Sequence, residues 1–121
     1  MKVRIEVVAI DCLMVRLFEV IDEANMPWML AAVARLREHF ASTLIDLVPS
    51  YTTLMVHYDL TQLNPNQARE LIHAALTDLA PDPHANGTHH VLPVRDDPSV
   101  GPELSLLAKR SGLSVREVIA C

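Results

Sequence analysis

Histidines are the side chains of this sequence with the widest chemistry, because imidazole binds metals and titrates near neutral pH. His84, His89 and His90 lie within seven residues of one another. Zinc sites usually draw their ligands from ordered elements at fixed short spacings, whereas His84 lies inside a loop with two prolines and an Asn-Gly pair, and His89 and His90 follow that loop. We therefore expect a solvated loop here and no metal-ligating residues.

The other histidines fall on predicted regular elements. His57 follows a strand pattern beside Tyr58 and Asp59, with no nucleophile at a sharp turn nearby, so a half-buried strand residue is favoured over a general base. His39 and His73 lie on the polar faces of predicted helices. None of these positions predicts a site.

The remaining reactive groups are also interpreted structurally. Cys12 has apolar neighbours and is expected to be a small core residue, while Cys121 is terminal and expected to be exposed. Asp96 and Asp97 are adjacent in an extended segment and would point to opposite sides, as in a solvated turn. The isolated glycines form no phosphate-binding loop. The sequence thus predicts no catalytic, cofactor-binding or metal-binding residue.

Period-two alternation predicts strands at residues 3–7, 12–18, 44–48 and 52–59. A helical period appears over residues 26–40, where one face carries Met29, Val33, Leu36 and Phe40. A second helix begins after Asn64, because Pro65 suits the first helical position and Gln67 completes a capping box. Residues 80–88 are a loop, and residues 89–94 are predicted to be a fifth strand.

Two short helices complete the predicted order. One follows Gly101 and Pro102 and ends at Gly112, and Ser114 with Glu117 forms a capping box for the last. The order β-β-α-β-β-α-β plus two helices predicts an α+β fold: a ferredoxin-like antiparallel sheet with two helices on one face. Residues 1–121 are expected to form a single domain, with residues 80–88 as an internal loop.

Composition excludes several classes of protein. The 121 residues are half apolar with a net charge of −5, so the chain is globular and lacks the basic footprint of a sequence-blind nucleic-acid binder. Because charges fall within the first six residues, we expect no signal peptide, and no apolar run approaches the ~20 residues of a membrane span. With only two cysteines, we expect a protein of a reducing compartment, the cytoplasm. From the net charge and the lack of a membrane span, we expect no nucleic-acid or membrane partners.

Residues 107–118 imitate a DNA-binding helix-turn-helix, with Ala108, Gly112 and Val118 at the positions which that motif uses for packing. Residues 95–121 carry four basic and four acidic side chains, too balanced to attract phosphates. A compact helix–Gly–helix corner is the favoured interpretation, and DNA binding is kept as a lesser alternative.

Two blocks of sequence resemble a known family. Residues 48–59, VPSYTTLMVHYD, are similar to the pattern VPxYxxLxVxYD of the B-type 5-oxoprolinase subunits, also called allophanate hydrolase subunit 1, a family that includes the KipI-type kinase inhibitors. Residues 92–94, 101–104 and 113–119 are similar to its IPV…GPDL…LSxeEVI stretch. The match spans essentially the whole chain, although residues 95–99, RDDPS, replace the family's CYGGE.

The resemblance implies an N-terminal domain without the family's C-terminal cyclophilin-like domain, which holds most of the catalytic residues. On this basis we expect an accessory module that docks partner subunits of an ATP-dependent amide or lactam hydrolase, with no cofactor bound by this chain itself. A KipI-type module that binds and inhibits a histidine kinase is the alternative. Enzymatic activity of the chain alone is left open, as is a homodimer formed through strand edges.

Overall fold

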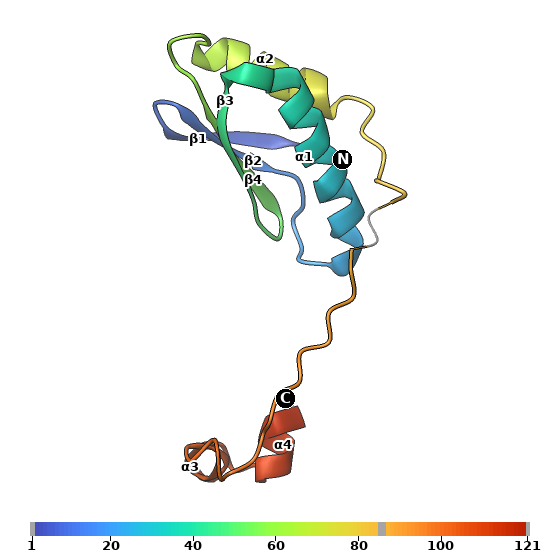
Figure 1. Ribbon diagram of the computed structural model, residues 1–121. Coiled ribbons are helices and arrows are strands. Elements are labelled where there is room, and N and C mark those ends of the chain that lie inside the picture. Colours follow the sequence, from blue (N-terminus) through green and yellow to red (C-terminus); the bar gives the residue numbers. More distant parts are fainter. Residues whose placement is uncertain (1, 85–86, 121) are drawn as a thin grey trace. The chain divides into compact units, whose positions relative to one another are not determined.

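The computed structural model describes residues 2–84 and 87–120. They belong to two compact units, Met1–Gly87 and Thr88–Cys121, and each unit is described here by itself. The expectation of one single domain therefore stays a prediction. Figure 1 labels the helices and strands of both units.

The first unit is an antiparallel sheet with helices packed on it. Its main elements are β1 (Arg4–Ala9), β2 (Cys12–Arg16), α1 (Met26–Phe40), β3 (Leu44–Pro49), β4 (Thr53–Tyr58) and α2 (Pro65–Leu76). The four strands lie in the order β1-β2-β4-β3, and each neighbouring pair is antiparallel. Together with two short helices in the second unit, this confirms the predicted α+β class.

The strand order explains why the sheet is ferredoxin-like. From β2 to α2 the chain runs β-α-β-β-α, the first five elements of a ferredoxin-like β-α-β-β-α-β unit. The place beside β2, where the sixth element of such a unit would pair, is occupied by β1.

The predicted fifth strand at residues 89–94 is wrong. These residues form no strand, and the side chains of Val91 and Leu92 are 78% and 81% exposed. In the strand order β1-β2-β4-β3, β1 from the start of the chain takes the position beside β2 that a ferredoxin-like unit gives to its last strand.

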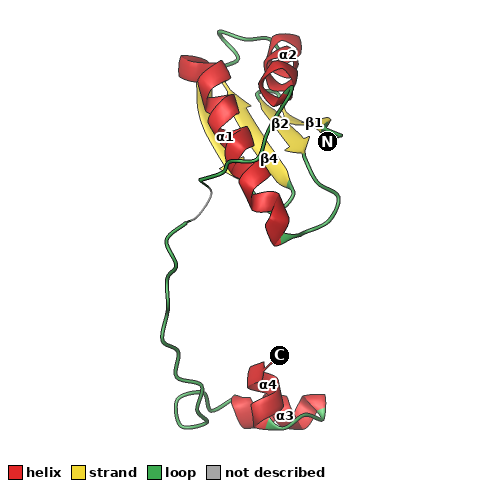
Figure 2. Cartoon of the chain, turned by 90° about the vertical axis from the view of Figure 1, so that its right-hand side faces the viewer, coloured by secondary structure: helices red, strands yellow, loops and turns green. Residues whose placement is uncertain are grey.

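Both helices cover one face of the sheet, as Figure 2 shows. The core consists of inward-facing side chains from β2, β3 and β4 and the facing sides of α1 and α2: Leu13, Val15, Leu17, Met29, Ala32, Leu36, Phe40, Leu47, Leu54, Val56, Tyr58, Ala68, Ile72 and Ala75. On α1 this confirms the predicted face with Met29, Leu36 and Phe40, although Val33 is only partly buried. Val7 is 61% exposed at the point where the β1–β2 register shifts.

The start of α2 confirms the predicted capping box. The Asn64 side-chain oxygen accepts a hydrogen bond from the Gln67 backbone N–H at 2.8 Å, and the Gln67 side chain accepts one from the Asn64 backbone N–H at 2.9 Å. Pro65 occupies the first helical position, where its missing N–H costs nothing.

The second unit contains the predicted helix–Gly–helix corner. α3 (Leu104–Ser111) ends at Gly112, whose φ of 73° is the left-handed conformation that glycine adopts without steric cost. The backbone N–H of Leu113 then donates to the carbonyl of Ala108 at 3.1 Å. α4 (Val115–Ala120) follows, and the Ser114 hydroxyl accepts a hydrogen bond from the backbone N–H of Glu117 at 3.2 Å.

Candidate functional site

The turn between β1 and β2 lies against the end of β4. Ala9 and Cys12 are paired across the hairpin, so Ile10 and Asp11 form a two-residue turn. The backbone N–H of Tyr58 donates to the carbonyl of Asp11 at 3.1 Å, and the Tyr58 hydroxyl donates to the carbonyl of Ile10 at 3.3 Å. These bonds fix the turn to the neighbouring strand.

Strand pairing then brings two reactive side chains together. Cys12 on β2 is the Cα partner of His57 on β4. Because Leu13 and Val56 point into the helix-covered core, the period of two places Cys12 and His57 on the opposite face of the sheet. The expectation that Cys12 is a core residue is therefore wrong, since it is only half-buried. The prediction of a half-buried His57 is confirmed.

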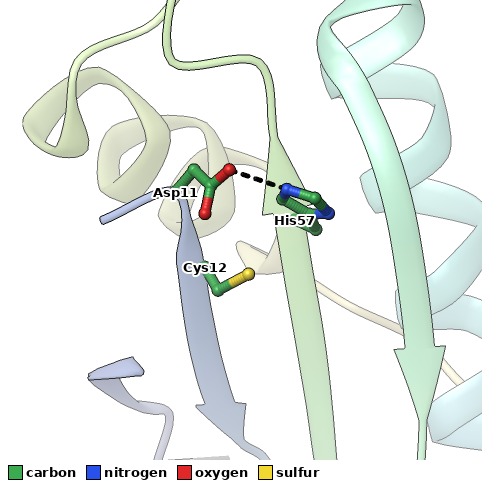
Figure 3. A group of neighbouring side chains, drawn as sticks. All are labelled: Asp11, Cys12 and His57. Carbon is green, nitrogen blue, oxygen red and sulfur yellow. Dashed lines mark hydrogen bonds and ion pairs between the residues drawn. The ribbon is translucent and has the colours of Figure 1, made fainter. Parts of the chain in front are cut away.

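Asp11, Cys12 and His57 form one cluster, shown in Figure 3. The Nε2 atom of His57 lies 2.8 Å from Oδ2 of Asp11, and the two side chains are 30% and 33% exposed. A nitrogen of His57, the sulfur of Cys12 and an oxygen of Asp11 all lie within 4.8 Å of one another. The cluster is therefore compact and reachable from solvent.

The electrostatics of the cluster centre on Asp11. The hydrogen bond from His57 lowers the pKa of the Asp11 carboxyl. Burial raises the pKa of the Cys12 thiol, and the negative charge of Asp11 raises it further. Burial likewise raises the pKa of Tyr58, with the charge of Asp11 as the second cause. The site thus holds an ionised carboxylate beside a protonated thiol at neutral pH.

This arrangement does not activate the thiol as a nucleophile. A catalytic Cys–His–Asp arrangement places the imidazole between the thiol and the carboxylate, with one ring nitrogen facing each. Here Nε2 of His57 faces Asp11, and the thiol pKa is raised rather than lowered. The three side chains offer instead a nitrogen, a sulfur and an oxygen donor converging on one point.

The other residues considered from the sequence lie elsewhere. His84 belongs to the first unit and His89 and His90 to the second, and all three are exposed. In residues 2–84 and 87–120, Asp11, Cys12 and His57 are the one group of three or more metal-ligating side chains at this spacing. Cys121 lies outside the described residues.

Asp96 and Asp97 confirm the prediction of a solvated turn. Both side chains are exposed. A side-chain oxygen of Asp97 accepts a hydrogen bond from the backbone N–H of Ser99 at 2.8 Å, which lowers the pKa of Asp97. The Asp97 carboxylate therefore organises the turn before α3.

Sequence reasoning missed Asp11 as a partner of His57. Asp11 lies in the β1–β2 turn, and 46 positions separate it from His57. Only the register of β2 against β4 could have revealed the pair, and that register does not follow from either strand alone.

A second feature of the first unit is an apolar pocket of about 450 Å³ at the start of α1. Its lining residues come from α1 and from the turn between β3 and β4: Met26, Met29, Leu30, Val33, Pro49, Ser50 and Tyr51. The side chains of Met26 and Tyr51 are 54% and 73% exposed, and the nearby Ile21 is 67% exposed. We call this set of lining residues the α1 groove.

The fold and these sites define an α+β domain with an exposed apolar groove and without an activated nucleophile in the Asp11–Cys12–His57 cluster. A family model, "Carboxyltransferase domain, subdomain C and D", matches residues 3–121. The chain therefore belongs to this family, the domain of the B-type 5-oxoprolinase subunits and of allophanate hydrolase subunit 1, as the sequence blocks indicated. No curated protein matches the chain. Among the described residues, no helix has both the length and the apolar character needed to cross a membrane.

Proposed function

We propose that this chain is an accessory carboxyltransferase-like domain that docks a partner subunit of an ATP-dependent amide or lactam hydrolase. Family membership supports the carboxyltransferase-like part of the proposal. The docking role is supported by the α1 groove, and in this proposal ATP and the bond-breaking residues belong to the partner subunits.

The observation that carries the docking role is the exposure of Tyr51, Met26 and Leu30 around one groove. Their side chains are 73%, 54% and 40% exposed, although each is apolar or aromatic. Contiguous exposed apolar side chains mark interaction surfaces, and aromatic anchors such as tyrosine contribute disproportionately to binding energy. Tyr51 also belongs to the sequence block that the family shares.

The local structure holds the groove open. Ser50 donates its backbone N–H to the carbonyl of Thr53 at 2.8 Å, which closes the β3–β4 turn and directs Tyr51 outward. On the other side, Met29 is buried at 3% exposure and anchors α1 to the core. A partner side chain can therefore enter a preformed surface, which lowers the entropic cost of association.

The test is co-purification of the full chain with the partner subunit of a 5-oxoprolinase encoded in the same genome. Tyr51→Ala and Met26→Lys should each weaken this association by roughly tenfold or more, as expected for anchor residues. Ile45→Lys is the matched control, because Ile45 is also apolar and 56% exposed but lies on β3 outside the groove. Equal affinity of all variants, or a wild-type chain that never associates, would contradict the proposal.

The regulatory alternative differs only in the partner. If the groove binds a histidine kinase, the chain should inhibit autophosphorylation of that kinase, and Tyr51→Ala should relieve the inhibition. Inhibition without binding to a hydrolase subunit would replace the docking proposal with the regulatory one.

A further inference from the structure

The Asp11–Cys12–His57 cluster has the donor chemistry of a metal site. Zinc is bound in proteins by cysteine sulfur, histidine nitrogen and carboxylate oxygen, and each residue of the cluster supplies one of these atoms. Three protein ligands with a fourth position left to water is the composition of open zinc sites. Hard cations such as magnesium prefer oxygen ligands alone, so the mixed set selects a softer ion.

The spacing of the donors is close to what a tetrahedral ion requires. Zinc–ligand bonds of about 2.0–2.3 Å place tetrahedral donor atoms roughly 3.3–3.8 Å apart. The three donor atoms lie within 4.8 Å of one another, and the His57–Asp11 pair lies at 2.8 Å. Metal binding therefore requires side-chain rotations that separate the His57–Asp11 pair slightly.

The backbone holds the donors in place. Cys12 and His57 are paired across two neighbouring strands, and Asp11 sits in a two-residue turn whose carbonyl is bonded to the N–H of Tyr58. Sites on such ordered elements are better preorganised than sites on loops. Partial exposure of Asp11 and His57 leaves a path by which an ion can enter.

We propose that Asp11, Cys12 and His57 bind a zinc ion on the sheet face opposite the helices, with the fourth coordination position open. On binding, the S–H bond of Cys12 breaks, its proton passes to solvent, and a Zn–S bond forms. His57 binds as neutral imidazole, so the thiolate and the Asp11 carboxylate together balance the +2 charge of the ion. None of these residues lines the α1 groove, so the metal site and the docking role are independent.

Cobalt(II) titration of the full chain tests the site, because cobalt replaces zinc and reports a thiolate ligand through a sulfur-to-metal charge-transfer band. The experiment uses a Cys121→Ser background, which leaves Cys12 as the one cysteine of the chain. We expect a saturable charge-transfer band in this background, and its displacement by zinc.

Variants of the ligands identify the site. Cys12→Ser should abolish the band, and His57→Asn should weaken cobalt binding by more than the roughly 10- to 100-fold that loss of an outer-shell partner costs. His73→Asn is the matched control, since His73 lies exposed on α2 and its substitution should leave binding unchanged.

Circular dichroism of each variant confirms folding, and a zinc-dependent rise in Tm should disappear together with the band. A missing band in the Cys121→Ser protein, or a band that survives Cys12→Ser, would overturn the proposal.

Discussion

The imidazole of His57 lies 2.8 Å from the carboxylate of Asp11, although 46 residues separate them in the chain. The contact joins the β1–β2 turn to β4, and Cys12 lies beside it across the strand pair. This one relationship lowers the pKa of the Asp11 carboxyl and lies within a group of three metal-ligating side chains. It is therefore the first target for mutation.

Asp11→Asn should change how stability depends on pH. The folded pKa of Asp11 is below the ~3.9 of an exposed aspartate, so its ionised form stabilises the folded state. That contribution is fully present above about pH 4 and is lost as the pH falls through the folded pKa. Urea unfolding should show a deficit for Asp11→Asn at pH 7 that shrinks at pH 3, whereas a deficit independent of pH would contradict this assignment.

Asp11→Asn should also make Cys12 more reactive. The charge of Asp11 contributes to the raised thiol pKa, so its removal increases the thiolate fraction at pH 8, and the thiolate is the nucleophile. In a Cys121→Ser background, iodoacetamide should alkylate Asp11→Asn faster than the parent. Glu38→Gln removes an exposed charge on α1 and should leave the rate unchanged; equal rates in all three proteins would refute the expectation.

Leu36→Ala should destabilise the first unit strongly. Leu36 is 0% exposed in the core between α1 and the sheet, and truncation of such a leucine costs about 2–5 kcal/mol through lost burial and a residual cavity. Leu30→Ala is the matched control on the same helix, because Leu30 is 40% exposed; its cost should stay below about 1 kcal/mol. Chemical denaturation measures both, and similar losses for the two variants would contradict the packing described.

Asn64→Ala should weaken the start of α2. The substitution removes the side-chain acceptor of the Gln67 N–H, which is one half of the capping box, at a cost of about 1 kcal/mol. Asn66→Ala replaces an exposed residue two positions further along and carries no cap, so its effect should be within about 0.5 kcal/mol. The two free energies of unfolding, compared directly, check the prediction.

Local patterns predicted most of the fold because the forces behind them are local. The capping box of Asn64 and Gln67 and the left-handed Gly112 depend on neighbouring residues alone. The helical face with Met29, Leu36 and Phe40 depends on a repeat within a single element. Residues 89–94 show the limit of this approach, since strand-like composition within one segment does not show that β1 takes the sheet position beside β2.

The candidate site could not be predicted in the same way. Cys12 looks like a core residue because apolar residues flank it, yet its immediate neighbour Leu13 takes the buried face. A single-residue change in strand register would exchange the two faces. The strand pattern accounts for His57 and the β1–β2 turn accounts for Asp11. Neither segment by itself indicates that the two side chains meet.

The sequence by itself therefore determined the helices, four of the five predicted strands and the family, because periodicity, capping and family-typical blocks are written in short stretches of residues. Only the tertiary structure decided that β1 takes the edge beside β2 and that Asp11, Cys12 and His57 converge. The physical reason is that strand order and register arise from pairing between distant segments, which is selected by packing of the whole sheet against α1 and α2.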